Sequence, residues 1–175
     1  FSMPEFDTSH VKSIVLMGHA GSGKTTLAEC MLFEAGLISR KGNIAEKTTV
    51  SDYHALEQER GNSIFSTLLH TKWRGYKINI IDTPGYDDFM GEVVSALRVA
   101  DTGITLLNAS AGVEVSTDIL WQYAEDFKTP IIFAVNKLDD EHADFEKTVL
   151  EAKNHFGNKI TVVQYPLKQG KDFHD

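Results

Sequence analysis

The stretch GHAGSGKT, from Gly18 to Thr25, decides the fold of this chain. It has the spacing of a phosphate-binding loop, in which a glycine-rich turn ends in a lysine and a hydroxyl residue. The apolar run Ser13–Met17 before it predicts a buried strand, and the helical spacing of apolar residues over Thr25–Ala35 predicts a helix after it. Backbone N–H groups of such a loop and helix N-terminus point at phosphate oxygens. We therefore expect residues 18–25 to cradle phosphate groups.

Outward from this loop, apolar runs alternate with amphipathic stretches, which indicates an α/β sheet. Two strands are expected at 64–73 and 77–82, joined by a hairpin turn at Arg74-Gly75, and three more at 103–108, 130–136 and 159–163. Helices are expected at 89–100, 115–127 and 144–156. The polar stretch 36–62 is predicted to be a functional or mobile loop. The fold class is therefore α/β, with a mostly parallel six-stranded sheet, one antiparallel edge strand and helices on both faces.

Length and composition agree with one ordinary domain. The chain has 175 residues, of which 42% are hydrophobic and 24% are charged, as in a globular protein. No run of ~18 apolar residues predicts a membrane span, and residues 1–10 lack the layout of a signal peptide. We expect Phe1 and Ser2 to be a tag remnant that precedes a short N-terminal extension. The single cysteine, Cys30, is expected to be a buried structural thiol in a cytoplasmic protein.

The charge balance limits the partners that this piece can bind. A formal net charge of −8 disfavours broad nucleic-acid binding, because attraction to phosphates needs clustered lysine and arginine. We therefore expect no DNA binding, and any RNA contact to be local or supplied by other domains. The chain is expected to be a monomer.

Two motifs supply the chemistry around the phosphates. Lys24 is expected to neutralise the β and γ phosphates, and the Thr25 hydroxyl to ligate Mg²⁺. The strand 77–82 ends in Asp82-Thr83-Pro84-Gly85, where Asp82 can hold a Mg²⁺-bound water and Gly85 can offer its N–H to a γ-phosphate. Upstream of this strand, Ser63 is a candidate second Mg²⁺ ligand, whereas Glu57 and its charged neighbours alone suggest a solvated charge run.

A third motif selects the base. Asn136-Lys137-Leu138-Asp139 follows an apolar strand. The Asp139 carboxylate can accept both N1–H and the 2-amino group of guanine, a pair of donors that adenine lacks. A mismatched base would leave it unpaired, at a cost of ~1–3 kcal/mol. We expect Asn136 to fix the loop and the Lys137 stem to cover one face of the purine.

With these motifs in place, the chain resembles the translational GTPases, most closely the elongation factor G-like paralogues. The resemblance covers about Val11 to Lys171 and rests on the motifs above together with Glu57-x-x-Arg60-Gly61-x-Ser63-Ile64. It implies a G domain of the phosphate-loop NTPase type over 11–164, with 165–175 as the truncated start of an insertion. It also implies a GTP-dependent factor that binds GTP/GDP and Mg²⁺ and engages the ribosome. The Ser-Ala guanine motif of the family is not found beyond Lys159.

Four positions depart from the family pattern. Tyr86 stands where most members carry a histidine that orients the attacking water. Ala20 and Gly21 replace a branched apolar residue and an aspartate, and Asn62 replaces an isoleucine. Binding groups are therefore retained, whereas groups that the family uses in hydrolysis are changed. We expect intrinsic GTP hydrolysis to be weak.

Several functions stay open at this point. The first is a GTPase that hydrolyses GTP slowly alone and faster on the ribosome, in translocation or a related step. The second is a GTP-dependent ribosome-binding switch that works without hydrolysis. A ribosome-protection or release-factor role is a variant of both, and an ATP-using protein is a weaker interpretation that Asp139 opposes.

The predicted site has three parts. The catalytic candidates are Tyr86, Lys24 and Gly85. The Mg²⁺ ligands are Thr25, Ser63 and Asp82. The groups expected to bind GTP or GDP are His19, Ala20, Gly21, Ser22, Gly23, Lys24, Thr25, Thr26, Asp82, Gly85, Asn136, Lys137 and Asp139.

Overall fold

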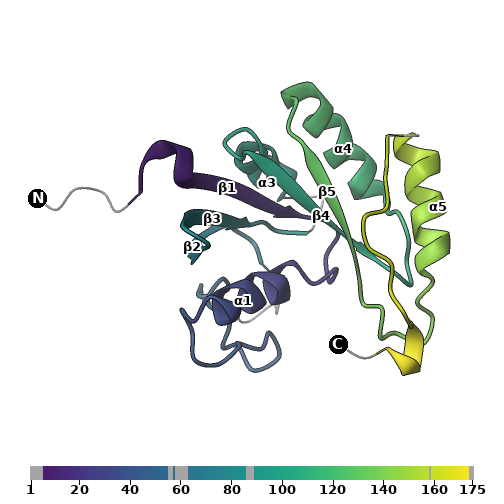
Figure 1. The fold of residues 1–175 in the computed structure, drawn as a ribbon, viewed down its shortest axis with the longest axis horizontal. Coiled ribbons are helices and arrows are strands. Elements are labelled where there is room, and N and C mark those ends of the chain that lie inside the picture. Colours follow the sequence, from purple (N-terminus) through teal and green to yellow (C-terminus); the bar gives the residue numbers. More distant parts are fainter. Residues whose placement is uncertain (1–5, 55–56, 58–62, 86–88, 158, 174–175) are drawn as a thin grey trace, which may run out of the picture.

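A five-stranded sheet runs through the centre of the computed structural model, which describes residues 6–54, 57, 63–85, 89–157 and 159–173 (Figure 1). The spatial order is β2-β3-β1-β4-β5. The strands are β1 (Val11–Met17), β2 (Thr67–Trp73), β3 (Tyr76–Asp82), β4 (Thr102–Asn108) and β5 (Ile131–Asn136). All neighbouring pairs are parallel except β2 and β3, which form an antiparallel hairpin at the edge. The carboxyl ends of the four parallel strands therefore meet at one edge, where α/β sheets bind ligands.

Helices cover both faces of this sheet, as the sequence predicted (Figure 1). On one face α1 (Lys24–Glu34) packs through Ala28 and Leu32 onto Leu16 and Ile80. Val15 points the other way, because successive strand residues face opposite sides, and packs against the helices of the second face. These are α3 (Met90–Leu97), α4 (Val115–Phe127) and α5 (Phe145–Phe156). Within the described ranges, no helix is long and apolar enough to cross a membrane.

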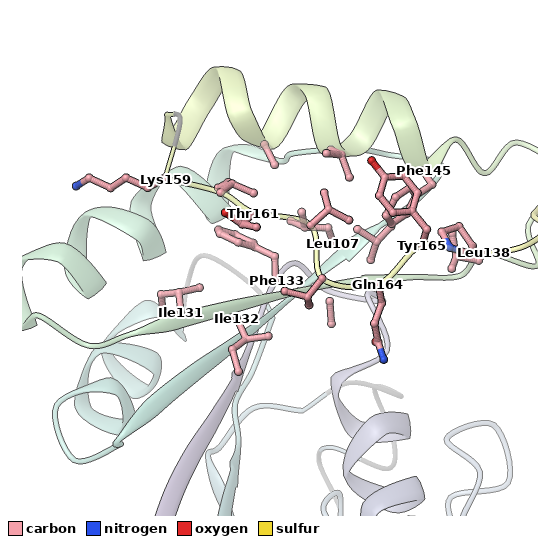
Figure 2. Close-up of a pocket in the computed structure, with 18 of the residues that line it drawn as sticks. Leu107, Ile131, Ile132, Phe133, Leu138, Phe145, Lys159, Thr161, Gln164 and Tyr165 are labelled. Atoms are coloured by element: carbon pink, nitrogen blue, oxygen red, sulfur yellow. The ribbon is translucent and has the colours of Figure 1, made fainter.

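The prediction of a sixth strand at 159–163 is wrong, because the sheet of the described residues ends at β5. The segment 159–166 runs irregularly beside β5 and α5, around an apolar cavity of about 860 Å³ (Figure 2). Ile160 packs with the cluster of Leu107 and Phe156, and the Tyr165 ring lies 5.3 Å from that of Phe145. These side chains hold the segment against α5, so its backbone does not join the ladder of β5.

Two element boundaries differ from the prediction by three residues. β2 begins at Thr67, three residues after the expected start at Ile64. The buried Glu57 carboxylate accepts the backbone N–H groups of Ile64 and Phe65 at 3.0 and 3.1 Å, so these residues are bonded outside the sheet. α3 ends at Leu97, before the expected end at residue 100.

Candidate nucleotide-binding site

The loop between β1 and α1 depends on two glycines that pass close to neighbouring strands. Gly18 has φ +130° and Gly23 has φ +101°, which is the region that side chains rarely adopt. A Cβ at Gly18 would lie 2.5 Å from the Leu106 carbonyl oxygen, and one at Gly23 would collide with the Asn136 amide. Glycine is therefore required at both ends of the loop for it to reach the carboxyl edge of the sheet.

Lys24 opens α1 and is buried under this loop. Its Nζ donates hydrogen bonds to the carbonyl oxygens of Gly18 and His19, at 2.8 and 2.9 Å. Burial lowers the pKa of Lys24 to about 8. The nearby Asp82 and Glu114 carboxylates have the opposite, smaller effect and raise this pKa. Phosphate oxygens at this place would favour the charged form and raise the pKa again. The lysine is therefore placed to bind an anion.

The three predicted Mg²⁺ ligands come together from three separate segments. Thr25 Oγ1 donates to Asp82 Oδ2 at 2.8 Å and lies 3.3 Å from Ser63 Oγ. Thr25 belongs to α1, Asp82 ends β3, and Ser63 comes from the long loop before β2. Hydroxyl and carboxylate oxygens are the ligand types that Mg²⁺ prefers.

The surroundings of Asp82 fit a divalent cation. Burial raises the pKa of Asp82 to about 6, although the Thr25 hydroxyl and the Lys24 ammonium lower it. Its Oδ1 is buried and has no hydrogen-bond partner among the described residues, and neither has the buried Ser22 hydroxyl of the phosphate loop. Leaving a buried carboxylate oxygen unpaired is costly. A cation with phosphate ligands would satisfy Asp82 and stabilise its ionised form.

Gly85 lies directly on the phosphate loop. A Cβ on this residue would lie 2.5 Å from Lys24 Nζ and 2.6 Å from the backbone of Ala20. Thr83 anchors the segment, because its hydroxyl donates to the Leu16 carbonyl oxygen at 2.7 Å. The Gly85 backbone is therefore close to the place expected for a terminal phosphate. Tyr86, the next residue and a predicted catalytic group, lies outside the described residues, as does Asn62.

The predicted base-binding residues follow β5 at the same edge of the sheet. Asn136 donates from Nδ2 to the Ser22 carbonyl oxygen at 2.8 Å and so ties this turn to the phosphate loop. Lys137 adopts a left-handed conformation with φ +59°, and the Asp139 side chain is exposed beyond it. The contacts of Asp139 with guanine stay a prediction. Gly21 and Thr26 are also exposed at the loop.

His19 is fixed by contacts that the sequence did not predict. Its ring Nδ1 lies 3.3 Å from the buried Ser116 hydroxyl, and Nε2 lies 3.5 Å from a Glu114 carboxylate oxygen. Both partners stand at the start of α4. The phosphate loop is therefore connected to a helix that is remote in sequence, and no local motif predicts this pairing.

The sequence also did not predict that carboxylates around the long loop are buried and accept hydrogen bonds. Asp52 accepts the Ser63 hydroxyl at 2.6 Å and so positions a predicted Mg²⁺ ligand. Glu29 on α1 accepts the N–H groups of Gly42 and Val50. Glu57, which alone suggested a solvated charge, is 1% exposed. An acidic residue in a polar loop carries no local signal that separates such a buried role from a solvated one. Cys30, expected to be buried, is only half-buried.

Known proteins resemble this chain over nearly its whole length. A family model described as the elongation factor Tu GTP binding domain matches residues 9–173. The chain is 40% identical over 164 residues to the elongation factor G-like protein of Thermotoga maritima, covering 94% of this chain and 23% of that protein. It is 41% identical over 158 residues to the mitochondrial ribosome-releasing factor 2 of Candida dubliniensis, covering 90% of this chain and 20% of that protein.

Two further comparisons extend the result. Elongation factor G of Mycoplasma genitalium is 36% identical over 167 residues, which are 95% of this chain and 24% of that protein. A crystal structure of a protein from Thermus thermophilus superposes with a TM-score of 0.88 at 33% identity, covering 94% of this chain and 25% of that one. The chain therefore spans a quarter or less of the length of these relatives.

The predicted resemblance is confirmed, because the matching family model extends over nearly the whole chain and the relatives include elongation factor G proteins. The chain belongs to the elongation factor Tu GTP-binding domain family and is a translational GTPase G domain.

Proposed function

We propose that this G domain binds GTP and GDP together with Mg²⁺ and is the nucleotide-responsive part of an elongation factor G-like factor that acts on the ribosome. The observation that carries the proposal is the meeting of Lys24, Thr25, Ser63 and Asp82 beside the phosphate loop. One cation, two hydroxyls and a buried carboxylate suit a Mg²⁺-bound polyphosphate. A divalent cation bound there would neutralise charge on the phosphates.

The residues of the chain then have distinct roles. Lys24 holds phosphate oxygens while the loop carbonyls keep its ammonium in place. Asn136 joins the base-binding turn to the loop, which lets Asp139 select guanine and Lys137 cover the purine. Gly85 offers its N–H to the terminal phosphate. The remaining nucleotide contacts come from the loop and the first turn of α1, at His19, Ala20, Gly21, Ser22, Gly23 and Thr26.

The same site supports a switch. Ser63 and Gly85 belong to two segments that are far apart in sequence, and both approach the phosphate loop within contact distance of Thr25 or Lys24. A γ-phosphate is the group that both would sense, as in other nucleotide switches. GTP would therefore hold the two segments together, and GDP would release them.

We further propose that intrinsic GTP hydrolysis is weak. Tyr86 occupies the position of the water-orienting histidine, and a neutral phenol cannot act as an imidazole does. Gly21 faces open space and has no side chain to offer near the phosphates. Loss of a water-orienting group typically lowers a rate by roughly 10²–10⁴.

Phosphate release from GTP by the full-length protein, with and without ribosomes, tests this proposal. We expect slow turnover alone, faster turnover with ribosomes, and a further rise of at least about tenfold in Tyr86→His. The exposed Tyr165→His is the matched control and should leave the rate unchanged. Fast turnover by the unaltered protein alone would contradict weak hydrolysis, and no release even with ribosomes would contradict GTPase activity.

The second candidate is a GTP-dependent ribosome binder that works without hydrolysis, favoured by the missing side chain at Gly21. It predicts that a non-hydrolysable GTP analogue supports ribosomal activity as well as GTP does. Activity that disappears with the analogue would exclude it. Because the relatives include both elongation factors G and ribosome-releasing factors, translocation and ribosome release are the two steps to assay.

A further inference from the structure

The turn between β2 and β3 lies at the edge of the sheet opposite the phosphate loop (Figure 1). β3 begins there at Tyr76, and its Lys77 is the register partner of Val11 at the start of β1. We call the exposed residues of this end, Lys12, Trp73, Arg74 and Tyr76, the hairpin-tip surface. None of them contributes to the nucleotide site.

The four side chains of the hairpin-tip surface gather on one side of the sheet. Trp73 and Tyr76 are direct partners across the hairpin, so their rings share a face. Lys12 pairs with Ile78, two residues beyond Tyr76, and therefore belongs to the same face. The Arg74 guanidinium lies 5.7 Å from the centroid of the Trp73 ring. Cations thus alternate with aromatic rings that are 50% and 41% exposed, for Trp73 and Tyr76.

The charge at this end is unlike that of the whole chain, which has a formal net charge of −8. Lys12, Arg74 and Lys77 form no ion pair with any residue that the structure describes. The His10 ring lies 5.1 Å from that of Tyr76, and His10 pairs with the Asp7 carboxylate at 2.7 Å.

The turn itself is not optimised for folding. Arg74 has φ +48° and Gly75 has φ +84°, so both central residues are left-handed. Two-residue turns of this kind favour asparagine or aspartate before glycine, because Cβ is strained in the left-handed region and their short polar side chains offset this by local hydrogen bonds. An arginine in this strained turn reduces stability and adds positive charge beside the Trp73 ring. A polyanionic ligand would neutralise this charge.

We propose that the hairpin-tip surface binds single-stranded nucleic acid, with phosphates at Arg74 and Lys12 and bases stacked on Trp73 and Tyr76. Exposed rings among cations are the arrangement by which proteins bind single strands. Cations alone attract an acidic peptide, whereas a single strand also stacks its bases on the exposed rings. The proposal goes beyond nucleotide binding and does not depend on GTP turnover.

The probes are fluorescein-labelled 12-nucleotide oligouridylate and oligothymidylate, titrated with the chain while anisotropy is measured at several salt concentrations. We expect dissociation constants on the order of 10⁻⁶–10⁻⁴ M and weaker binding at higher salt, with about 0.7 logarithmic units lost per phosphate contact for each tenfold rise in salt. Stacking should quench Trp73 fluorescence, which is isolated in a Trp121→Phe background. Stronger binding of the ribose probe or of the deoxyribose probe identifies RNA or DNA as the preferred strand.

Three variants decide whether the surface is responsible. Trp73→Ala should weaken binding about 5- to 100-fold, as for loss of one stacked base, and Trp73→Phe should retain most of it. Arg74→Gln should weaken binding and reduce the salt dependence. Lys153→Gln on α5 is the matched control and should change nothing. GDP affinity, measured on every variant, reports an intact fold because its site lies at the opposite edge.

Two results would overturn the proposal. One is oligonucleotide binding unchanged in both Trp73→Ala and Arg74→Gln while GDP affinity is also unchanged. The other is displacement of the oligonucleotide by polyglutamate at equal charge concentration, without quenching of Trp73, which would identify an acidic protein as the partner. If Trp73→Ala loses GDP binding as well, its fold is damaged, and the oligonucleotide affinities of Arg74→Gln and Trp73→Phe then decide whether the surface binds the strand.

Discussion

At the scale of single residues, burial makes the charged forms of two groups in the nucleotide site, Lys24 and Asp82, unfavourable. Burial lowers the pKa of Lys24 to about 8 and raises that of Asp82 to about 6, so both are less charged than free side chains would be. Phosphate and Mg²⁺ reverse both shifts. Each group therefore gains more from ligand binding than an exposed residue would.

These shifts predict a two-sided pH dependence of Mg²⁺–GDP affinity. Above about pH 8 the ligand-free Lys24 is neutral, so binding must take up a proton, and below about pH 6 Asp82 is protonated, so binding must release one. We expect affinity to fall up to about tenfold per pH unit on each side. Calorimetric titration from pH 5 to 9.5 measures this.

Asp82→Asn separates the fall in affinity at acid pH, the acid limb, from the fall at alkaline pH. It should abolish the acid limb and the Mg²⁺ dependence, whereas Asp126→Asn, at an exposed position of α4, should alter neither. The free energy of unfolding of the ligand-free chain should change in the opposite direction. Because the pKa of Asp82 in the folded chain is raised above 3.8, this free energy rises as pH falls from about 6 toward 3.8. The gain is at most about 3 kcal/mol. An acid limb that survives in Asp82→Asn would assign it to another group.

Backbone conformation at Gly23 gives a second residue-scale prediction. Gly23→Ala would force a side chain into φ +101° and against the Asn136 amide. We expect a loss of roughly 1–3 kcal/mol of unfolding free energy and strongly reduced GDP binding. Gly91→Ala is the control, because that position in α3 is open and alanine favours helix by about 1 kcal/mol. Urea unfolding and GDP titration compare the two, and equal behaviour would show that Gly23 tolerates a side chain.

At the scale of elements, the two halves of the long loop 36–63 are hydrogen-bonded to different parts of the molecule. Glu29, buried on α1, accepts N–H groups from Gly42 and Val50, which lie at the two ends of one loop segment. Residues nearer β2 are bonded instead to Glu57 and, through Ser63, to the predicted Mg²⁺ site. The first half of the loop is therefore anchored on α1.

Glu29→Gln tests this anchor. An amide offers one acceptor oxygen where the carboxylate offers two, so one of the two backbone donors loses its partner. We expect a cost of about 1–3 kcal/mol and faster amide hydrogen exchange over residues 42–50, with β1 unaffected. The exposed Glu125→Gln is the control. Unchanged exchange over 42–50 would mean that other contacts hold the segment.

At the scale of the whole molecule, ligand binding and the fold share one edge of the sheet. β1, β3 and β5 each deliver one motif to that edge, namely the phosphate loop, Asp82 and Asn136. Because the nucleotide joins all three, its binding energy adds to the stability of the folded chain.

Thermal unfolding with nucleotides checks this coupling and the choice of base. GDP with Mg²⁺ at about 100 times its dissociation constant should stabilise the chain by about 2.7 kcal/mol, which is several degrees in Tm. ADP at the same concentration should give little shift, because Asp139 would be left unpaired. EDTA should remove much of the GDP effect. Equal shifts with ADP and GDP would restore the ATP interpretation and contradict the role of Asp139.

Local patterns were sufficient where a residue's neighbours in sequence fix its conformation. The phosphate loop, the Arg74-Gly75 hairpin and helices 115–127 and 144–156 followed from glycine spacing and apolar periodicity. The expected strand 159–163 failed because its alternating pattern fits a strand, yet Ile160 and Tyr165 are held by α5. Packing of these side chains onto α5 and β4 leaves no mark in a five-residue window.

The sequence by itself determined the family and the order of the elements from β1 to α5, because motif spacing reflects local backbone geometry. Only the tertiary structure decided that Ser63 reaches Thr25, that Glu29 and Glu57 are buried and that His19 is held by α4. It also decided that the sheet of the described residues ends at β5. The polar contacts depend on burial, which removes water from these groups and obliges them to find partners that are remote in sequence. The end of the sheet depends on the apolar packing of Ile160.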